Sequence, residues 1–235
     1  MESKLKHFQY AELVSNRKQC RRCVGLRNPA EPELAEFDSC EIGPWSRLHG
    51  DLNAPLMIIG QDWGDVRYFQ AHQGLDDLRN PTMQVLEMLL RGINHPVSLS
   101  AYNANPQGIF LTNAVLCLKE GGLQGKVQRE WFVNCGIHFL EAQIRLVAPR
   151  VVVTLGNLAF QATLAAFSLE KRPLRKSVDD EAPILLPNGA QLVPVYHCGR
   201  RILNTHRCFK QQEVDWQRVG KALGSLHTCP ESPES

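Results

Sequence analysis

The hydrophobic positions of this chain fall into short, mostly apolar runs, separated by longer stretches with helical periodicity. These runs occupy residues 56–59, 108–117 and 151–155, and their few polar side chains include Thr112, Asn113 and Thr154. Runs of this kind are typical of strands that are buried on both faces of a parallel sheet. Two further runs, 184–186 and 191–196, flank the sequence Pro-Asn-Gly, which favours a tight turn.

The stretches between these runs have the spacing of amphipathic helices. The predicted helices span residues 7–17, 82–91, 130–147, 157–167 and 206–223. Residues 24–53 are rich in Pro, Gly and charged residues and are expected to be irregular. The alternation of strands with helices predicts an α/β fold, a three-layer α/β/α sandwich around a central, mostly parallel four-stranded sheet.

Length and composition favour a single domain. The chain has 235 residues, of which 43% are hydrophobic, and it can therefore bury one sizeable core. We expect this domain to span residues 1–227. Residues 228–235, which are dominated by Pro, Glu and Ser, are expected to form a disordered tail.

The charges are nearly balanced, with 26 Lys and Arg against 24 Asp and Glu, so no overall positive field indicates nucleic acid binding. Local basic runs exist, but such runs are usually solvated surface. The first residues lack the apolar core of a secretion signal, and no apolar run is long enough to span a bilayer. We therefore expect a cytoplasmic protein.

A Gly-Gln-Asp-Trp-Gly segment at residues 60–64 follows the first predicted strand directly. Ligands of α/β sheets bind beyond the carboxyl ends of the strands, so Asp62 stands where a catalytic acid or base is expected. The alternative is a loop carboxylate that caps the next helix. Two other strand exits, at residues 113–117 and 196–201, are expected to converge on the same crevice.

The eight cysteines do not suggest a disulfide framework, because the cytoplasm keeps thiols reduced. Cys20 and Cys23 form a chelating pair, and Cys117 can approach Cys135 in the next helix. Four thiolates suit either tetrahedral zinc or a 4Fe–4S cluster, and Cys40 is an alternative third ligand. The cysteines expected to be ordinary free thiols are Cys40, Cys198, Cys208 and Cys229.

Five motifs follow one another along the chain. They are Cys20-x-x-Cys23, Thr112-Asn113-x-x-x-Cys117, Cys135 in the next helix, Leu155-Gly156-x-x-Ala159, and the loop Tyr196-His197-Cys198-Gly199-Arg200-Arg201. In this order they resemble the uracil-DNA glycosylase superfamily, and their layout is closest to its iron–sulfur branch. The resemblance extends over most of the chain, from Cys20 to about Arg207.

The resemblance implies a 4Fe–4S cluster on Cys20, Cys23, Cys117 and Cys135, with zinc as the alternative. In that family the cluster is structural and lies near the DNA-binding surface. The chain departs from the iron–sulfur branch at residues 60–62, which instead resemble the Gly-Gln-Asp of the cluster-free branch. The final loop also lacks the usual His-Pro-Ser.

The resemblance further implies a role for each strand exit. Asp62 would stabilise the positive charge that grows on the sugar and orient the attacking water. His197 would donate a hydrogen bond to the departing base. Asn113 would pair with uracil and mismatch cytosine, because uracil offers N3–H and O4 where cytosine offers an acceptor and an amino group. The alternatives are a surface-loop His and an Asn that satisfies backbone groups.

Gly60, Gln61 and Gly64 are the other residues expected to bind the base, together with an aromatic side chain that stacks on it. Phe69 is assigned to stacking, with Tyr68 as the neighbouring candidate. Gly64 stands where the cluster-free branch has a Tyr that blocks the methyl group of thymine. This difference leads to the hypothesis that the pocket also accepts altered bases other than uracil.

Three arginines, Arg200, Arg201 and Arg207, follow His197 and are expected to contact phosphates. Ile202 or Leu203 would act as a wedge in the duplex. The expected partner is DNA that contains uracil or another altered base, bound by a monomer with no membrane contact.

The sequence thus predicts a DNA glycosylase that hydrolyses the N-glycosidic bond of uracil in base-excision repair, in the cytoplasm at the nucleoid. Two alternatives stay open. One is a protein that holds uracil-containing DNA without turnover, or bonds to it covalently through His197. The other is a redox or zinc-stabilised protein.

Overall fold

The computed structural model describes residues 2–77, 79–95, 108–122, 125, 127–180 and 182–224. The predicted tail and Cys229 lie outside these residues. The helices are α1 (Glu2–Gln19), α2 (Pro44–Leu48), α3 (Val66–Ala71), α4 (Pro81–Gly92), α5 (Arg129–Cys135), α6 (Glu141–Val147), α7 (Asn157–Ala166), α8 (Leu174–Asp179), α9 (Arg200–Thr205) and α10 (Phe209–Leu223). The strands are β1 (Leu26–Arg27), β2 (Leu56–Asp62), β3 (Ile109–Val115), β4 (Leu118–Lys119), β5 (Val151–Leu155), β6 (Ile184–Leu185) and β7 (Gln191–Val195).

The central sheet has the strand order β3-β2-β5-β7-β6. The strands β3, β2, β5 and β7 are parallel to one another, which confirms the predicted mostly parallel sheet. The predicted number of four strands is wrong by one. The two-residue β6 precedes the Pro-Asn-Gly segment, and β7 follows it and pairs antiparallel to β6, which is the fifth strand.

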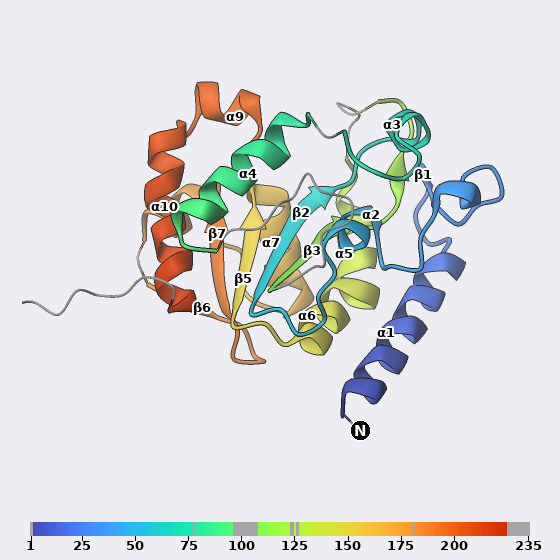
Figure 1. The fold of residues 1–235 in the computed structure, drawn as a ribbon, viewed down its shortest axis with the longest axis horizontal. Helices are drawn as coiled ribbons and strands as arrows, with labels where there is room; N and C mark the ends of the chain where they lie inside the picture. The colour runs from blue at the N-terminus through green and yellow to red at the C-terminus, as the bar shows by residue number, and fades with distance from the viewer. Residues whose placement is uncertain are drawn as a thin grey trace, which may run out of the picture.

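Helices cover both faces of this sheet, so the three predicted layers are present (Figure 1). Side chains alternate between the faces along each strand. In β2, Met57 and Ile59 join the core under α1, α5, α6 and α7, whereas Leu56 and Ile58 join the core under α2, α4 and α10.

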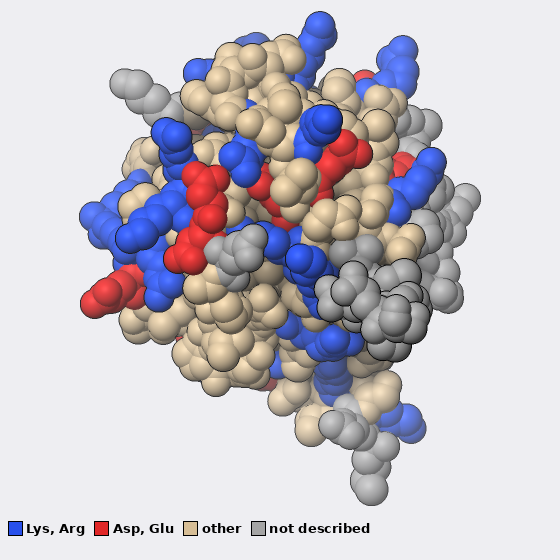
Figure 2. Space-filling view, turned by 90° about the vertical axis from the view of Figure 1, so that its left-hand side faces the viewer, with Lys and Arg blue, Asp and Glu red and all other residues tan. Residues whose placement is uncertain are grey.

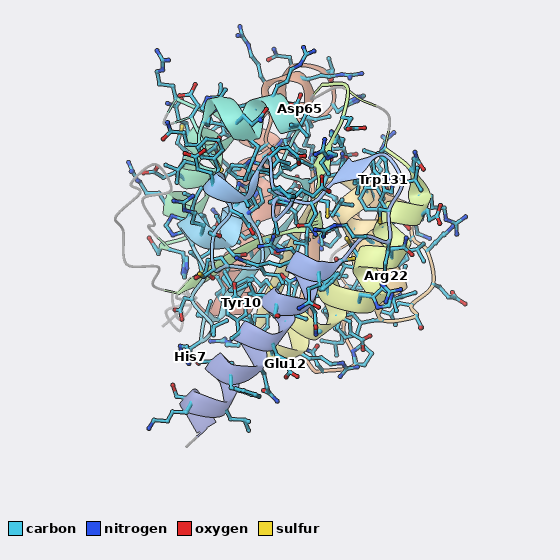
Figure 3. The ribbon with its side chains drawn as sticks, turned by 90° about the vertical axis from the view of Figure 1, so that its right-hand side faces the viewer. His7, Tyr10, Glu12, Arg22, Asp65 and Trp131 are labelled. Carbon is cyan, nitrogen blue, oxygen red and sulfur yellow. The ribbon has the colours of Figure 1, made fainter. Side chains whose placement is uncertain are left out.

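The long helix α1 is attached to the body of the molecule through Tyr10 (Figure 3). The Tyr10 hydroxyl donates to Glu41 at 2.6 Å and accepts from the backbone N–H of Ile42 at 3.0 Å. Its ring meets Phe110 of β3 edge-on. Burial, together with the negative charge of Glu41, raises the pKa of this hydroxyl, which therefore stays protonated. The middle of α1 is thus fixed against the sheet, and Cys20 follows the last residue of this helix directly.

Three predicted segments differ in detail. Residues 24–53 are not irregular throughout, because they contain β1, the short 3-10 helix η1 (Ala35–Phe37) and α2. The helix predicted over 130–147 is interrupted by a π-helical turn, η2 (Gly136–Leu140). The last predicted helix, 206–223, corresponds to α10, and the short helix α9 that precedes it was not predicted. Among the described residues, none of the helices combines the length and the apolar character needed to cross a membrane.

Candidate active site and thiol pocket

A cleft opens at the carboxyl ends of β2, β5 and β7. Its walls include Asp62 at the exit of β2, Asn157 at the start of α7, His197 after β7, and Arg200 and Arg201 of α9. Ligands of open α/β sheets bind in this position, where helix N-termini and strand exits meet. The structure thus brings together residues from the first and the last predicted strand exits.

Asp62 lies in this cleft with its side chain only 7% exposed. Its Oδ1 atom is 3.1 Å from Nζ of Lys119, and its Oδ2 atom accepts a hydrogen bond from the side-chain amide of Gln61. The cap of the following helix α3 is Asp65, whose side chain accepts from the backbone N–H of Tyr68 at 2.7 Å. Asp62 is therefore not the helix cap, and its carboxylate is directed to the cleft and the lysine.

His197 lines the same cleft. Its Nδ1 atom accepts a hydrogen bond from the backbone N–H of Gly199 at 2.9 Å. Because Nδ1 is the acceptor, the proton of the neutral ring resides on Nε2. Burial lowers the pKa of His197, and the charge of Asp62 opposes this shift. The ring is thus an uncharged donor at neutral pH.

Asn113 is buried on β3 directly beside Gly60 of β2. A Cβ atom on Gly60 would lie 2.7 Å from Nδ2 of Asn113 and 2.7 Å from the ring of Trp45, so only glycine leaves room here. Both Trp45 and Gly60 line the cleft. The Nδ2 group of Asn113 has no hydrogen-bond partner among the described residues. A buried amide donor therefore stands directly behind the wall of the cleft.

The assignment of Phe69 to stacking is wrong. The Phe69 ring is 1% exposed and packs against Leu34 and Leu118 in a small separate core. Helical geometry turns its neighbour Tyr68 the other way, into the cleft. Two tryptophans, Trp45 and Trp63, also line the cleft. Trp45 was not predicted, because it lies in the segment expected to be irregular.

The arginines divide into two groups. Arg200 and Arg201 line the cleft and are exposed. Arg207, predicted to contact phosphates, instead forms a two-pronged ion pair with the buried Asp215, at 2.6 and 3.0 Å. Its guanidinium also lies 5.7 Å from the ring centre of Tyr196. These contacts hold Arg207 against α10, and it is not among the residues that line the cleft.

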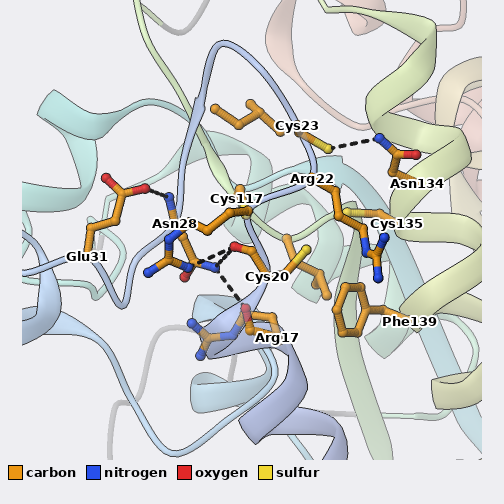
Figure 4. A pocket seen from close by; sticks show the side chains of 13 residues that line it. Arg17, Cys20, Arg22, Cys23, Asn28, Glu31, Cys117, Asn134, Cys135 and Phe139 are labelled. Carbon is orange, nitrogen blue, oxygen red and sulfur yellow. Dashed lines mark hydrogen bonds between the residues drawn. The ribbon is translucent and has the colours of Figure 1, made fainter.

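A second pocket, near the end of α1, is lined by Cys20, Cys23, Cys117 and Cys135 (Figure 4). These four cysteines come from the segment after α1, the exit of β3 and the end of α5. The side-chain amide of Asn134 donates to Sγ of Cys23 at 3.5 Å. The other described cysteines lie elsewhere. Cys40 and Cys208 are exposed, and Cys198 is buried with its Sγ directed to the backbone oxygen of Thr82.

Burial raises the pKa of Cys135 to about 12 and that of Cys117 still higher, and the charges of neighbouring thiolates add to both shifts. Four thiolates in this pocket would therefore require a strongly positive group between them. In the described part of the chain, no three His, Cys, Asp or Glu side chains form a group that could hold a metal ion.

The fold and the first pocket define an α/β protein with an enzyme-type cleft at the carboxyl ends of a parallel sheet. Comparison with known proteins gives the family. The model of the uracil DNA glycosylase superfamily matches residues 48–219, and the chain therefore belongs to this superfamily.

Two relatives carry the name Type-5 uracil-DNA glycosylase. The chain is 29% identical over 210 residues to the protein of Pyrobaculum aerophilum, which covers 84% of this chain and 86% of the relative. It is 31% identical over 134 residues to the protein of Thermus thermophilus, which covers 56% of this chain and 58% of the relative.

Proposed function

We propose that this protein is a uracil-DNA glycosylase, which removes uracil from DNA by hydrolysis of the N-glycosidic bond in base-excision repair. The observation that carries the proposal is the placement of Asp62 and His197 in the lining of one cleft. The superfamily match and the names of the two relatives support the same activity. An enzyme of this kind must first turn the nucleotide out of the duplex, which costs a few kcal/mol of unstacking.

The two side chains suit the two charges that develop as the bond breaks. The sugar becomes positive, and the carboxylate of Asp62 stabilises this charge and orients the water that attacks C1′. The base becomes negative, and the Nε2–H group of His197 donates to its oxygen. A neutral imidazole can act as this donor because the hydrogen bond from the Gly199 N–H to Nδ1 leaves the ring proton on Nε2.

Uracil itself is selected by the inner wall of the cleft. The amide of Asn113 offers both a donor and an acceptor to the edge of the base. Tyr68 is the aromatic side chain that we assign to stacking, since it lines the cleft and Phe69 does not. Gln61 and Gly64 complete this wall, and the small Gly64 extends the proposed substrate range to other altered bases.

DNA binds across the mouth of the cleft. Arg200 and Arg201 contribute phosphate contacts, and Ile202 of the same helix lies at the cleft where a wedge would enter. Figure 2 shows that Lys and Arg side chains stand among Asp and Glu on the face that carries α9 and α10. Binding through such a mixed surface relies on placed contacts rather than on overall charge.

We further propose that the thiol pocket holds a 4Fe–4S cluster on Cys20, Cys23, Cys117 and Cys135, whose donor set fits such a cluster. The fit rests on the donor set, since four buried or half-buried thiols line one pocket and would be stabilised as thiolates by a cationic cluster. The cluster would link the end of α1 to β3 and α5. It would supply stability next to the sheet and take no part in bond cleavage.

The test is excision of uracil from a labelled duplex, followed on a denaturing gel. We expect Asp62→Asn to lower the rate by at least a hundredfold, because a transition-state charge loses its partner. The control is Glu213→Gln, which removes an exposed carboxylate on α10. Duplexes with hypoxanthine or a thymine mismatch test the wider substrate range.

Wild-type rates in Asp62→Asn would remove this residue from its role. A protein–DNA band that survives denaturation, without free abasic product, would show a covalent binder of uracil-containing DNA instead of an enzyme.

A further inference from the structure

The cleft contains an amine that uracil excision does not use. Lys119 lines the cleft, its side chain is 5% exposed, and its Nζ atom lies 3.1 Å from Oδ1 of Asp62. Surface lysines are usually solvated and mobile, whereas this one is enclosed together with the carboxylate assigned to catalysis.

The backbone fixes Lys119 at this place. It lies on the short strand β4, where it pairs with Leu26 of β1. Its backbone N–H donates to the backbone oxygen of Gly64 at 3.1 Å, and its backbone forms an isolated parallel β-bridge with that of Asp65. β4 is thus attached to the segment that follows β2, and the amine is held against the exit of that strand.

The product of excision brings an electrophile to this amine. In the proposed reaction Asp62 orients the water that attacks C1′, and this water lies about 3–3.5 Å from C1′, the distance of reacting groups. The water is one hydrogen bond, about 2.8 Å, from Asp62, and Nζ of Lys119 is 3.1 Å from Oδ1 of the same carboxylate, which places the amine within about 12 Å of C1′. A change of lysine rotamer turns the amine toward the sugar. After excision, the ring-opened abasic sugar carries an aldehyde at C1′. Lysine amines form Schiff bases with carbonyl groups of this kind.

We propose that Lys119 forms a Schiff base with C1′ of abasic sites, so that the protein also captures abasic DNA covalently and reversibly. The inference rests on the proposed function, because it acts on the product of that reaction.

The step balances without a further reactant. A C–N bond forms between Nζ and C1′, and the C1′–O bond breaks. Of the three protons on the lysine ammonium, two leave with the oxygen as water and one stays on the iminium nitrogen. One positive charge is present before and after, and nothing is oxidised or reduced. The carboxylate of Asp62 is placed to carry protons from Nζ to the departing oxygen.

The experiment supplies the abasic site independently of uracil excision. A labelled strand with a single purine is depurinated with acid and then annealed to its complement, which gives a duplex with one abasic site. This duplex is incubated with the full chain and sodium borohydride. Hydride reduces the imine to a stable secondary amine. We expect a protein–DNA band on a denaturing gel, and mass spectrometry should locate the adduct on Lys119.

Three variants decide the assignment. Lys119→Met is expected to lose the trapped band by at least tenfold. Lys119→Arg keeps a positive charge beside Asp62 and should bind abasic DNA in a gel shift, yet also lose trapping. Lys210→Met removes an exposed lysine of α10 and should trap like the wild type.

Undiminished trapping in Lys119→Arg, or an adduct on another residue, would overturn the inference. Uracil excision without any trapped abasic DNA would also overturn it, and would leave the proposed function intact. Trapping without uracil excision would instead support this inference and reject the proposed function.

Discussion

His197 is held in one protonation state by its own loop. The backbone N–H of Gly199 points at Nδ1, so a proton on that atom would replace a hydrogen bond with a clash of two N–H groups. Burial acts in the same direction, because it disfavours the charged ring. Both effects keep the Nε2–H donor of a neutral imidazole available for the anion that leaves the sugar.

The pKa of His197 is therefore expected to lie below the usual value of about 6.5 for histidine. The ring stays neutral as the pH falls through 6.5, while the unfolded chain takes up a proton there, so this group makes the fold less stable at lower pH. In Asp62→Asn the pKa should fall further, since the opposing charge is removed. NMR titration of the ring, assigned with His197→Gln, measures both values. A wild-type value above 6.5 would contradict this account.

Other side chains show where sequence reasoning stops. Asp62 could be predicted because it is an acidic residue two positions after the glycine that ends an apolar run. Lys119 could not, since its contact with Asp62 depends on how β4 joins the segment after β2. Arg207 was assigned to phosphates from its position after His197. Its ion-pair partner in the structure is Asp215, which lies on α10, the helix that begins at Phe209.

The alignment of β2 with β3 builds the inner wall of the cleft. Parallel pairing places Gly60 opposite Asn113, and Trp45 of α2 closes over the same glycine. The three residues come from elements that are far apart in the sequence. Strands β2, β3 and β5 could be predicted because buried strands appear in the sequence as mostly apolar runs. Their lateral order and the position of α2 could not be predicted, because both depend on packing.

Gly60→Ala is expected to abolish efficient uracil excision. The added methyl group would lie 2.7 Å from Asn113 Nδ2 and from the Trp45 ring, so the amide or the indole must move. Such overpacking costs about 1–3 kcal/mol of stability. The control is Gly92→Ala at the end of α4, where a Cβ atom meets nothing within 4 Å. Excision rates and thermal unfolding measure both effects, and equal rates in the two variants would refute the proposed wall.

The thiol pocket lies where three parts of the fold meet. Cys20 and Cys23 follow α1, Cys117 follows β3, and Cys135 ends α5, so one bound group would connect three parts of the fold. Cys117 is also two residues before Lys119, which places this pocket and the cleft on one continuous segment of chain. The C-x-x-C motif indicated a metal site, but the convergence of all four thiols depends on the folded chain.

Loss of one proposed ligand should therefore affect the entire protein. We expect Cys117→Ser to lose the bound iron and the broad visible absorption of a 4Fe–4S cluster. Stability should fall by more than about 3 kcal/mol, which lowers Tm by roughly 6–12 °C in a chain of this size. Cys40→Ser and Cys208→Ser change exposed cysteines outside the pocket and should keep both iron and Tm.

Iron analysis, absorption spectra and thermal unfolding give three independent readouts. Zinc in place of iron in the wild type would point to the alternative metal. Loss of iron in Cys40→Ser would identify Cys40 as a ligand in place of one of the four proposed cysteines. Full iron content in Cys117→Ser would contradict the proposed ligand set, because a pocket with three thiolates would then hold the cluster as well as one with four.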